Sequence, residues 1–97
     1  MLKIAELRFN SRGVYVEGII TEMGKSREVN LRAGGKARVA EAILTDETGS
    51  IKLNLWNEDI GRVKKGDRVR IENGYVTVFK GEKRLNVGRY GKLSVNE

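Results

Sequence analysis

The sequence has 97 residues, of which 39% are hydrophobic, so it can fill one small core and little more. It contains no cysteine and no histidine, which excludes disulfides, thiolate nucleophiles, Ser-His-Asp triads and ordinary zinc or iron–sulfur sites. No apolar run is long enough to span a membrane. These limits favour a binding protein over an enzyme, and they predict neither a metal nor a cofactor.

The N-terminal residues 1–8 carry charges where a signal peptide needs an apolar stretch. We therefore expect a cytoplasmic protein that associates with chromosomal DNA if its ligand lies there. We expect no membrane partner, and we expect a monomer.

Positive charge gathers in two segments of a chain whose formal net charge is +6. Residues 24–38 contain five basic residues and one acidic residue, as do residues 79–92, whereas residues 39–63 contain two basic and five acidic residues. Because a merely soluble surface would spread its charge, two basic loops indicate a binding site. The basic residues are Lys25, Arg27, Arg32, Lys36 and Arg38 in the first loop and Lys80, Lys83, Arg84, Arg89 and Lys92 in the second.

Side chains alternate with a period of two along most of the chain, and no segment has the pattern of a long amphipathic helix. The sequence therefore predicts an all-β protein. The expected strands, in chain order, are Val14–Met23, Arg38–Asp46, Ser50–Trp56, Arg68–Phe79 and Arg84–Val87, with a short addition at Leu93–Val95.

The segments between these strands are polar or contain glycine. Residues 24–37, which include Gly34 and Gly35, are expected to form a mobile loop, and residues 57–67 a connector with one helical turn over 58–63. Tight turns are expected at 46–49 and 80–83. A turn that ends in glycine accounts for Asp46 as an acceptor of hydrogen bonds from backbone amides, so a metal site is not expected there.

Five strands with a break between the third and the fourth are the layout of the OB-fold, a five-stranded Greek-key barrel. We therefore expect residues 1–97 to form a single OB-fold domain. An SH3-like barrel of similar size is the alternative that the pattern leaves open.

Alternation also assigns an inward and an outward face to each strand. The inward positions change from odd to even numbers between Ile71 and Val76, so a bulge is expected at Asn73 and Gly74. The expected inward residues are Ile51, Leu53, Leu55, Val69, Ile71, Val76, Val78, Leu85 and Val87. The expected outward residues are Ser50, Lys52, Asn54, Trp56, Tyr75, Thr77, Phe79, Arg84 and Asn86.

Three of the six aromatic residues, Trp56, Tyr75 and Phe79, fall on this outward side. Exposed rings lower solubility unless a ligand covers them, so this face is the predicted binding site. Lys52 and Arg84 alternate with the rings, as in stacking platforms flanked by phosphate partners. The alternatives are a loop that covers Trp56 and a second small core that buries Tyr75 and Phe79.

Other candidate contacts surround the rings. Asn54 and Asn86 could bond base edges, although ordinary exposed asparagines are the simpler expectation. The remaining candidates are Arg27, Arg32, Lys36, Thr77, Lys80 and Lys83.

Residues 39–56 and 66–81 resemble the second to fourth strands of archaeal single-stranded DNA-binding proteins, a family related to replication protein A. The shared features are the Asp-Glu-Thr-Gly turn at 46–49, a Trp seven residues after its Gly, and the later Phe-Lys-Gly at 79–81. The resemblance covers residues 3–95 and implies that Trp56, Tyr75 and Phe79 stack on bases.

The sequence departs from this family at two places. Tyr75 stands where archaeal relatives have Trp. Relatives often continue into a Gly-rich acidic tail that recruits replication and repair proteins, whereas this sequence ends at Glu97.

The sequence thus predicts a sequence-tolerant single-stranded DNA-binding protein for replication, recombination or repair. Base stacking and phosphate contacts in a basic groove are the expected mode of binding. Two alternatives stay open. One is an RNA- or tRNA-binding OB module, because the 2′-hydroxyl is read by individual contacts that composition does not show. The other is a protein-interaction OB domain in which the rings form an interface.

Overall fold

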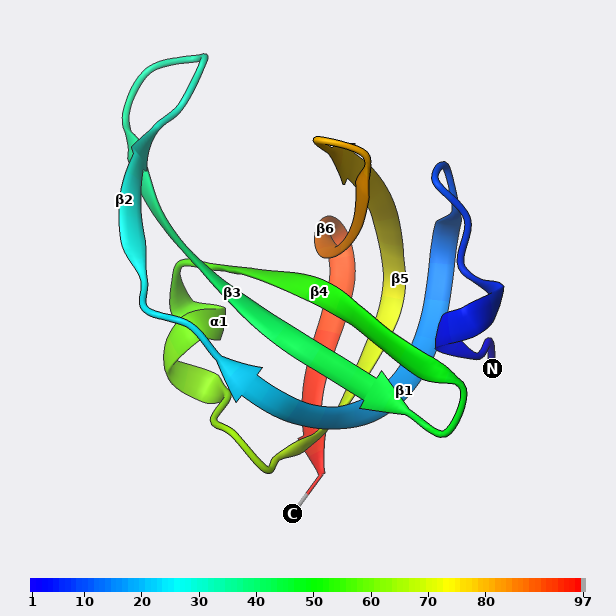
Figure 1. The fold of residues 1–97 in the computed structure, drawn as a ribbon. Helices are drawn as coiled ribbons and strands as arrows, with labels where there is room; N and C mark the ends of the chain where they lie inside the picture. Colours follow the sequence, from blue (N-terminus) through cyan, green and yellow to red (C-terminus); the bar gives the residue numbers. More distant parts are fainter. Residues whose placement is uncertain (97) are drawn as a thin grey trace.

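The computed structural model describes residues 1–96 except the side chain of Arg89, so Glu97 and that predicted basic side chain lie outside the described residues. Six strands, one 3-10 turn and one short helix make up this part of the chain (Figure 1). They are η1 (Ile4–Glu6), β1 (Arg12–Met23), β2 (Arg27–Asn30), β3 (Lys36–Asp46), β4 (Gly49–Trp56), α1 (Glu58–Arg62), β5 (Arg68–Phe79) and β6 (Glu82–Asn96).

Five of the strands close a barrel. They are hydrogen-bonded in the order β1-β5-β6-β4-β3, and a further pairing between β1 and β3 completes the closure. Every pair is antiparallel except β4–β6, which is parallel, and α1 lies in the crossover between β4 and β5. This is the OB layout and not that of an SH3-like barrel, so the predicted fold class is confirmed.

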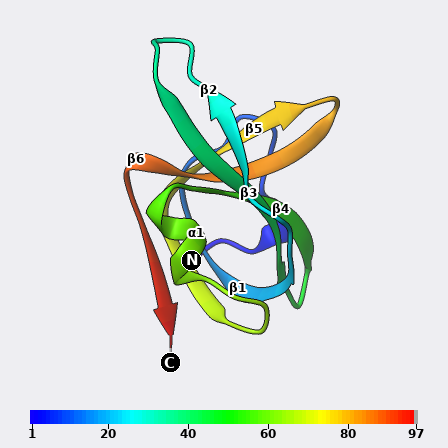
Figure 2. The same ribbon diagram turned by 90° about the vertical axis from the view of Figure 1, so that its left-hand side faces the viewer.

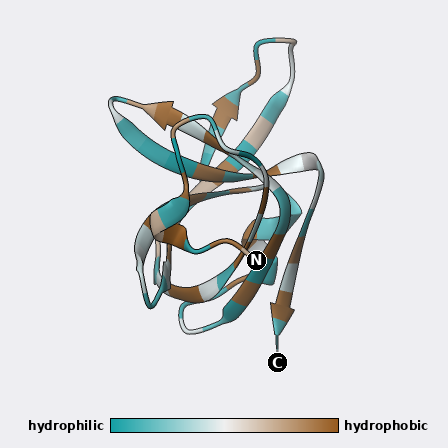
Figure 3. Cartoon of the chain, turned by 90° about the vertical axis from the view of Figure 1, so that its right-hand side faces the viewer, coloured by the Kyte–Doolittle hydropathy of each residue, from teal (hydrophilic) through white to brown (hydrophobic). Residues whose placement is uncertain are grey.

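Aliphatic side chains fill the barrel, and bands of hydrophobic and hydrophilic residues alternate along its strands (Figure 3). Ile4 and Leu7, from the segment before β1, join the same core. The predicted inward residues that are buried are Ile51, Leu53, Leu55, Val69, Ile71, Val76 and Leu85, and Val87 packs against them while partly buried.

The predicted bulge lies in β5, where the register with β6 shifts between Glu72 and Gly74. Asn73 takes a positive φ of 54° there. A Cβ on residue 74 would stand 2.9 Å from the carbonyl oxygen of Asn86, so only glycine lets the two strands approach this closely. The bulge reverses the inward parity, and it therefore turns Tyr75 and Phe79 outward.

Val78 was predicted to join Val76 in the inward set, but it is not buried, because its side chain is 48% exposed. The pairing of β1 with β5 ends at Tyr75, whereas β5 and β6 stay paired up to Phe79 and Glu82. The tip of the β5–β6 hairpin thus projects beyond the barrel (Figure 2), where no opposing strand covers its inward side. The alternation of residues within β5 does not show where the neighbouring strand β1 stops, so it could not predict the exposure of Val78.

The prediction of a loop over residues 24–37 is also wrong in part. Arg27–Asn30 form β2, which pairs with β3 from Lys36 to Val39 and extends the barrel wall into a hairpin. The four residues of β2 are mostly exposed and show no apolar alternation, so their sequence does not indicate a strand. Backbone pairing with β3 holds them in an extended conformation. The hairpin tip is confirmed at Gly34 and Gly35, which both have a positive φ.

Two short strands were expected near the C-terminus, but one strand, β6, runs from Glu82 to Asn96. Its first half pairs with residues 74–79 and its second half with residues 68–72. Gly91 permits the bend between the halves, since a Cβ there would stand 2.9–3.1 Å from three backbone atoms. The predicted helical turn is confirmed as α1.

Asp46 joins the β3–β4 turn to the N-terminal segment. Its Oδ1 accepts hydrogen bonds from the amides of Thr48 (2.7 Å) and Gly49 (3.2 Å), as predicted, and its Oδ2 accepts one from the amide of Ile4 (2.9 Å). Burial raises the pKa of Asp46, but the hydrogen bonds from Thr48, Ile4 and Gly49 outweigh burial and hold the pKa below its usual value. The carboxylate thus stabilises the fold in its charged form.

We predict that Asp46→Asn lowers the free energy of unfolding by about 1–2 kcal/mol near pH 7, because the amide nitrogen cannot accept the hydrogen bond from Ile4. The native pKa lies below the unfolded one, so this stabilisation is complete above the unfolded pKa of about 4 and is lost as the pH falls through the native pKa. Urea unfolding at about pH 7 and pH 3 measures the difference, which should shrink in acid. Glu22→Gln, at an exposed position, is the control. Equal stability of Asp46→Asn and wild type near pH 7 contradicts the prediction.

Candidate nucleic-acid interface

The outward side of β4, β6 and β5 forms one continuous face. Register partners on neighbouring strands point to the same side and lie about 5 Å apart, so their side chains form rows across the face. The two central rows are Asn54–Asn86–Tyr75 and Lys52–Arg84–Thr77. Eight of the predicted site residues therefore lie on this face or at its ends, once Trp56 and Phe79 are added at the ends of β4 and β5.

The three predicted aromatic side chains lie outside the barrel core, as alternation indicated. Tyr75 is 39% and Phe79 53% exposed, and Trp56 is partly exposed at the end of β4, opposite Val39. The ring of Tyr75 lies above Gly88, where a Cβ would stand 3.3 Å from two ring carbons. These rings leave flat apolar surface open on one side of the protein.

Arg84 and Lys52 lie among the rings, but acidic side chains already hold them. Arg84 Nη1 lies 2.8 Å from Glu41 Oε1, and the guanidinium carbon lies 5.0 Å from the Phe79 ring centroid. Lys52 Nζ lies 2.7 Å from a carboxylate oxygen of Glu82 and 3.9 Å from one of Glu41. The hydrogen bond from Arg84 holds the pKa of Glu41 below its usual value. The Glu41–Arg84 ion pair keeps the guanidinium against the Phe79 ring.

Asn86 was expected to be an ordinary exposed asparagine, and this is wrong, because its side chain is only 3% exposed. Its Oδ1 accepts a hydrogen bond from Asn54 Nδ2 (3.1 Å), and its Nδ2 donates to Thr77 Oγ1 (3.0 Å). This outward position is thus buried, and its partners come from the two neighbouring strands, β4 and β5. Asn54, Asn86 and Thr77 therefore form a hydrogen-bonded floor between the rings.

The β2–β3 hairpin carries the first basic loop, and it projects from the same end of the barrel as the β5–β6 hairpin (Figures 1 and 2). Arg27, Arg32 and Lys36 are exposed along it. Lys36 makes one ion pair, with Glu28 at 3.4 Å, and both side chains are more than half exposed. The structure thus provides two projecting arms beside the aromatic face, and the first arm carries three of the predicted cations.

The second arm carries Lys80 and Lys83, which point in different directions. Lys80 Nζ lies 5.4 Å from the Phe79 ring centroid, at the edge of the aromatic face. Lys83 has the opposite parity to Arg84, and its Nζ donates to the carbonyl oxygen of Leu7 at 2.9 Å. The structure therefore brings Lys80 to the rings and places Lys83 on the other side of the hairpin.

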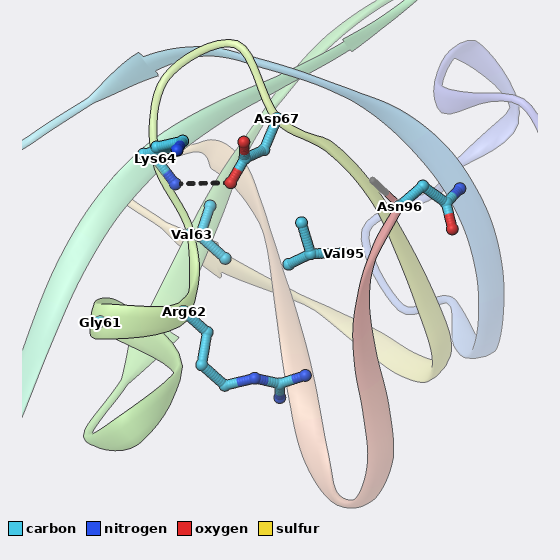
Figure 4. A pocket seen from close by; sticks show the side chains of 7 residues that line it. All are labelled: Gly61, Arg62, Val63, Lys64, Asp67, Val95 and Asn96. Atoms are coloured by element: carbon cyan, nitrogen blue, oxygen red, sulfur yellow. Dashed lines mark hydrogen bonds between the residues drawn. The ribbon is translucent and has the colours of Figure 1, made fainter.

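A separate pocket of about 530 Å³ lies between α1 and the end of β6, and it contains none of the predicted site residues (Figure 4). Three of its polar groups bond within the fold, since the amide of Lys64 donates to Asp67 Oδ2 (3.0 Å) and Arg62 donates to the Leu93 carbonyl (2.8 Å). Across residues 1–96, no group of three acidic side chains is placed to hold a metal ion. The described helices include none that is long and apolar enough to cross a membrane.

A closed OB barrel with open rings on its third and fourth barrel strands, flanked by basic hairpins, has the features of an OB module for single strands. Residues 10–95 match the family model described as single-stranded DNA binding protein Ssb-like, OB fold, and the chain belongs to this family. The predicted resemblance to archaeal single-stranded DNA-binding proteins is thereby confirmed.

Individual relatives agree with this assignment. The single-stranded DNA binding protein Ssb of Saccharolobus solfataricus is 37% identical over 92 residues, which are 95% of this chain and 62% of the relative. Replication factor A of Methanothermobacter thermautotrophicus is 29% identical over 99 residues, 99% of this chain and 12% of that protein. The second OB-fold domain of replication protein A from Methanococcus maripaludis has a TM-score of 0.82 at 30% identity, covering 99% of this chain and 94% of that domain. The chain thus spans less than two thirds of the length of these two curated relatives.

We predict that Asn86→Ala lowers the free energy of unfolding by about 1–3 kcal/mol, because Asn54 and Thr77 lose their shared partner in a site that water hardly reaches. Urea unfolding measures the change, with Asn10→Ala at an exposed position as the control. If both variants are as stable as wild type, the hydrogen-bonded floor does not support the face.

Proposed function

We propose that this chain binds single-stranded DNA of any base sequence by stacking the bases on Trp56, Tyr75 and Phe79. The observation that carries the proposal is the position of these three rings on one outward face, beyond the core that the barrel needs. Every base has a π-face, so stacking is worth about 1–3 kcal/mol per base and tolerates any sequence. A duplex hides these faces in its own stack, and this favours unpaired strands.

Phosphates bind the cations around the rings. Arg27, Arg32 and Lys36 on one arm and Lys80 on the other are exposed and reach the strand first. Lys52 and Arg84 are paired with carboxylates in the unbound protein, so a phosphate at these positions has to replace a carboxylate. With about four phosphates neutralised, the logarithm of affinity falls with the logarithm of salt at a slope near −3.

Asn54, Thr77 and Asn86 serve this function mainly as the floor that supports the rings. Lys83 contributes to the positive field of its hairpin from the far side. In this proposal residues 1–97 act as one OB domain that binds and does not catalyse.

The names replication factor A and replication protein A, borne by two of these relatives, support a role in DNA replication. Single strands also arise in recombination and repair, and a sequence-tolerant binder serves all three processes. We place the activity on chromosomal DNA in the cytoplasm, with other replication and repair proteins as partners. The protein acts as a monomer in this proposal.

We predict that Trp56→Ala weakens binding to oligo-dT by about 1–3 kcal/mol, roughly 5- to 150-fold, because one stacking surface is lost. The thermal midpoint should stay near that of wild type, because Trp56 is not part of the core. Fluorescence anisotropy of a labelled oligomer gives the affinity, and Trp56→Phe, which keeps a ring, is the matched control. Unchanged affinity, or unfolding of the variant, contradicts the assignment of Trp56. Matched RNA and duplex competitors in the same assay test the ligand class.

We predict that Glu41→Gln tightens binding at low salt by about fivefold, since removal of the carboxylate releases Arg84 for a phosphate, whereas Lys52 keeps its closer partner Glu82. The slope of the salt dependence should also steepen by about 0.7 for each further phosphate that the variant neutralises. Titrations at several salt concentrations measure both quantities, and Glu22→Gln controls for the change in net charge. Weaker binding, or an unchanged slope, would show that Glu41 does not compete with DNA.

A further inference from the structure

A groove of about 630 Å³ lies next to the aromatic face, on the side of β1. Tyr75 and Thr77 line this groove and also belong to the aromatic face, so the two surfaces are continuous. Beyond them the groove reaches Arg12, at the start of β1, and the rings of Phe9 and Tyr90. The rings on β4 and β5 therefore do not mark the end of the aromatic surface.

Strand register extends the central row of the face into this groove. Tyr75 is the partner of Asn86 in β6 and, on its other side, the partner of Arg12 in β1. Partners in register point to the same side, with about 5 Å from strand to strand. The amide of Val76 also donates to the carbonyl oxygen of Ser11 (2.9 Å), which ties the segment before β1 to the hairpin. A strand that crosses the face along this row arrives at Arg12.

Two rings in the groove lie outside the core. Phe9 is 56% and Tyr90 82% exposed. Lys83, anchored at the carbonyl of Leu7, lies 5.7 Å from the Phe9 ring centroid. The described residues that line the groove include Arg12 and no carboxylate. Solvent-exposed rings near cations are the combination that unpaired nucleotides recognise.

We propose that this groove is a second base-binding subsite, which takes the nucleotides of the same single strand that lie beyond Tyr75. Phe9 and Tyr90 are its stacking surfaces, and Arg12 is its phosphate partner. Lys83, which faces away from Trp56 and Phe79, adds positive charge beside Phe9. This inference rests on the proposed function, and it lengthens the bound segment without adding sequence preference.

Oligomer length separates the two subsites. An oligo-dT of about four nucleotides can cover the face with Trp56, Tyr75 and Phe79 alone, whereas one of about ten can also reach the groove. Longer oligomers offer more binding registers to any protein. We therefore compare each variant with wild type at the same length, so that this statistical factor cancels.

We predict that Tyr90→Ala and Phe9→Ala each bind the long oligomer about 5- to 100-fold more weakly than wild type and the short oligomer equally well. Tyr90→Phe should restore binding to the long oligomer, because it keeps the ring. Leu2→Ala, an exposed apolar position outside the groove, should change neither affinity. Anisotropy titrations with both oligomers measure these effects, and thermal melts report folding. Tyr90, the more exposed of the two, remains informative if Phe9→Ala loses stability.

Wild-type affinity for the long oligomer in both variants overturns the subsite. An equal loss on the two lengths overturns it as well, since the rings would then act within the first face or through the fold. In both cases wild type still binds the short oligomer, so the proposed function stands. If wild type binds neither oligomer, the proposed function itself fails and the groove proposal fails with it.

Discussion

Closure of the barrel determines which side of each strand is available for a ligand. The parallel β4–β6 pair and the β1–β3 pairing hold the strands so that Leu53 and Leu85 are fully buried, and alternation then turns their neighbours outward. On β5 the bulge at Asn73 and Gly74 is needed in addition, because without it Tyr75 would take an inward position. The aromatic face thus follows from the way in which the core is filled.

The face combines rings that can stack on bases with two cations, Arg84 and Lys52, that are already paired with carboxylates. Glu41 holds Arg84 against the Phe79 ring and, together with Glu82, holds Lys52. Such pairs keep side chains in place before the ligand arrives, but every phosphate that binds there has to displace a carboxylate. In the proposed function, stacking therefore provides most of the affinity at the centre of the face, and the exposed cations on the two hairpins provide most of the salt dependence.

Alternation in the sequence was sufficient to predict the bounds of β5, its bulge and the outward position of all three rings, because each depends on residues close together in the chain. The exposure of Val78 depends on where β1 stops, and the strand β2 depends on the edge that β3 offers. The hydrogen bonds of the buried Asn86 depend on side chains from the two neighbouring strands. Glu41 and Phe9 gave no local signal, since their neighbours in the fold are distant in sequence. The sequence therefore predicted the faces of the strands but not the contacts between side chains upon them.

In the proposed function, outward rings stack on unpaired bases, and the fluorescence of Trp56, the only tryptophan, reports on this stacking. The most direct measurement is its fluorescence during titration with oligo-dT and, separately, with the same strand annealed to its complement. Stacking on Trp56 should give saturable quenching by the single strand and little change with the duplex, because only unpaired bases offer a free π-face. No quenching by oligo-dT, or equal quenching by the duplex, would contradict it.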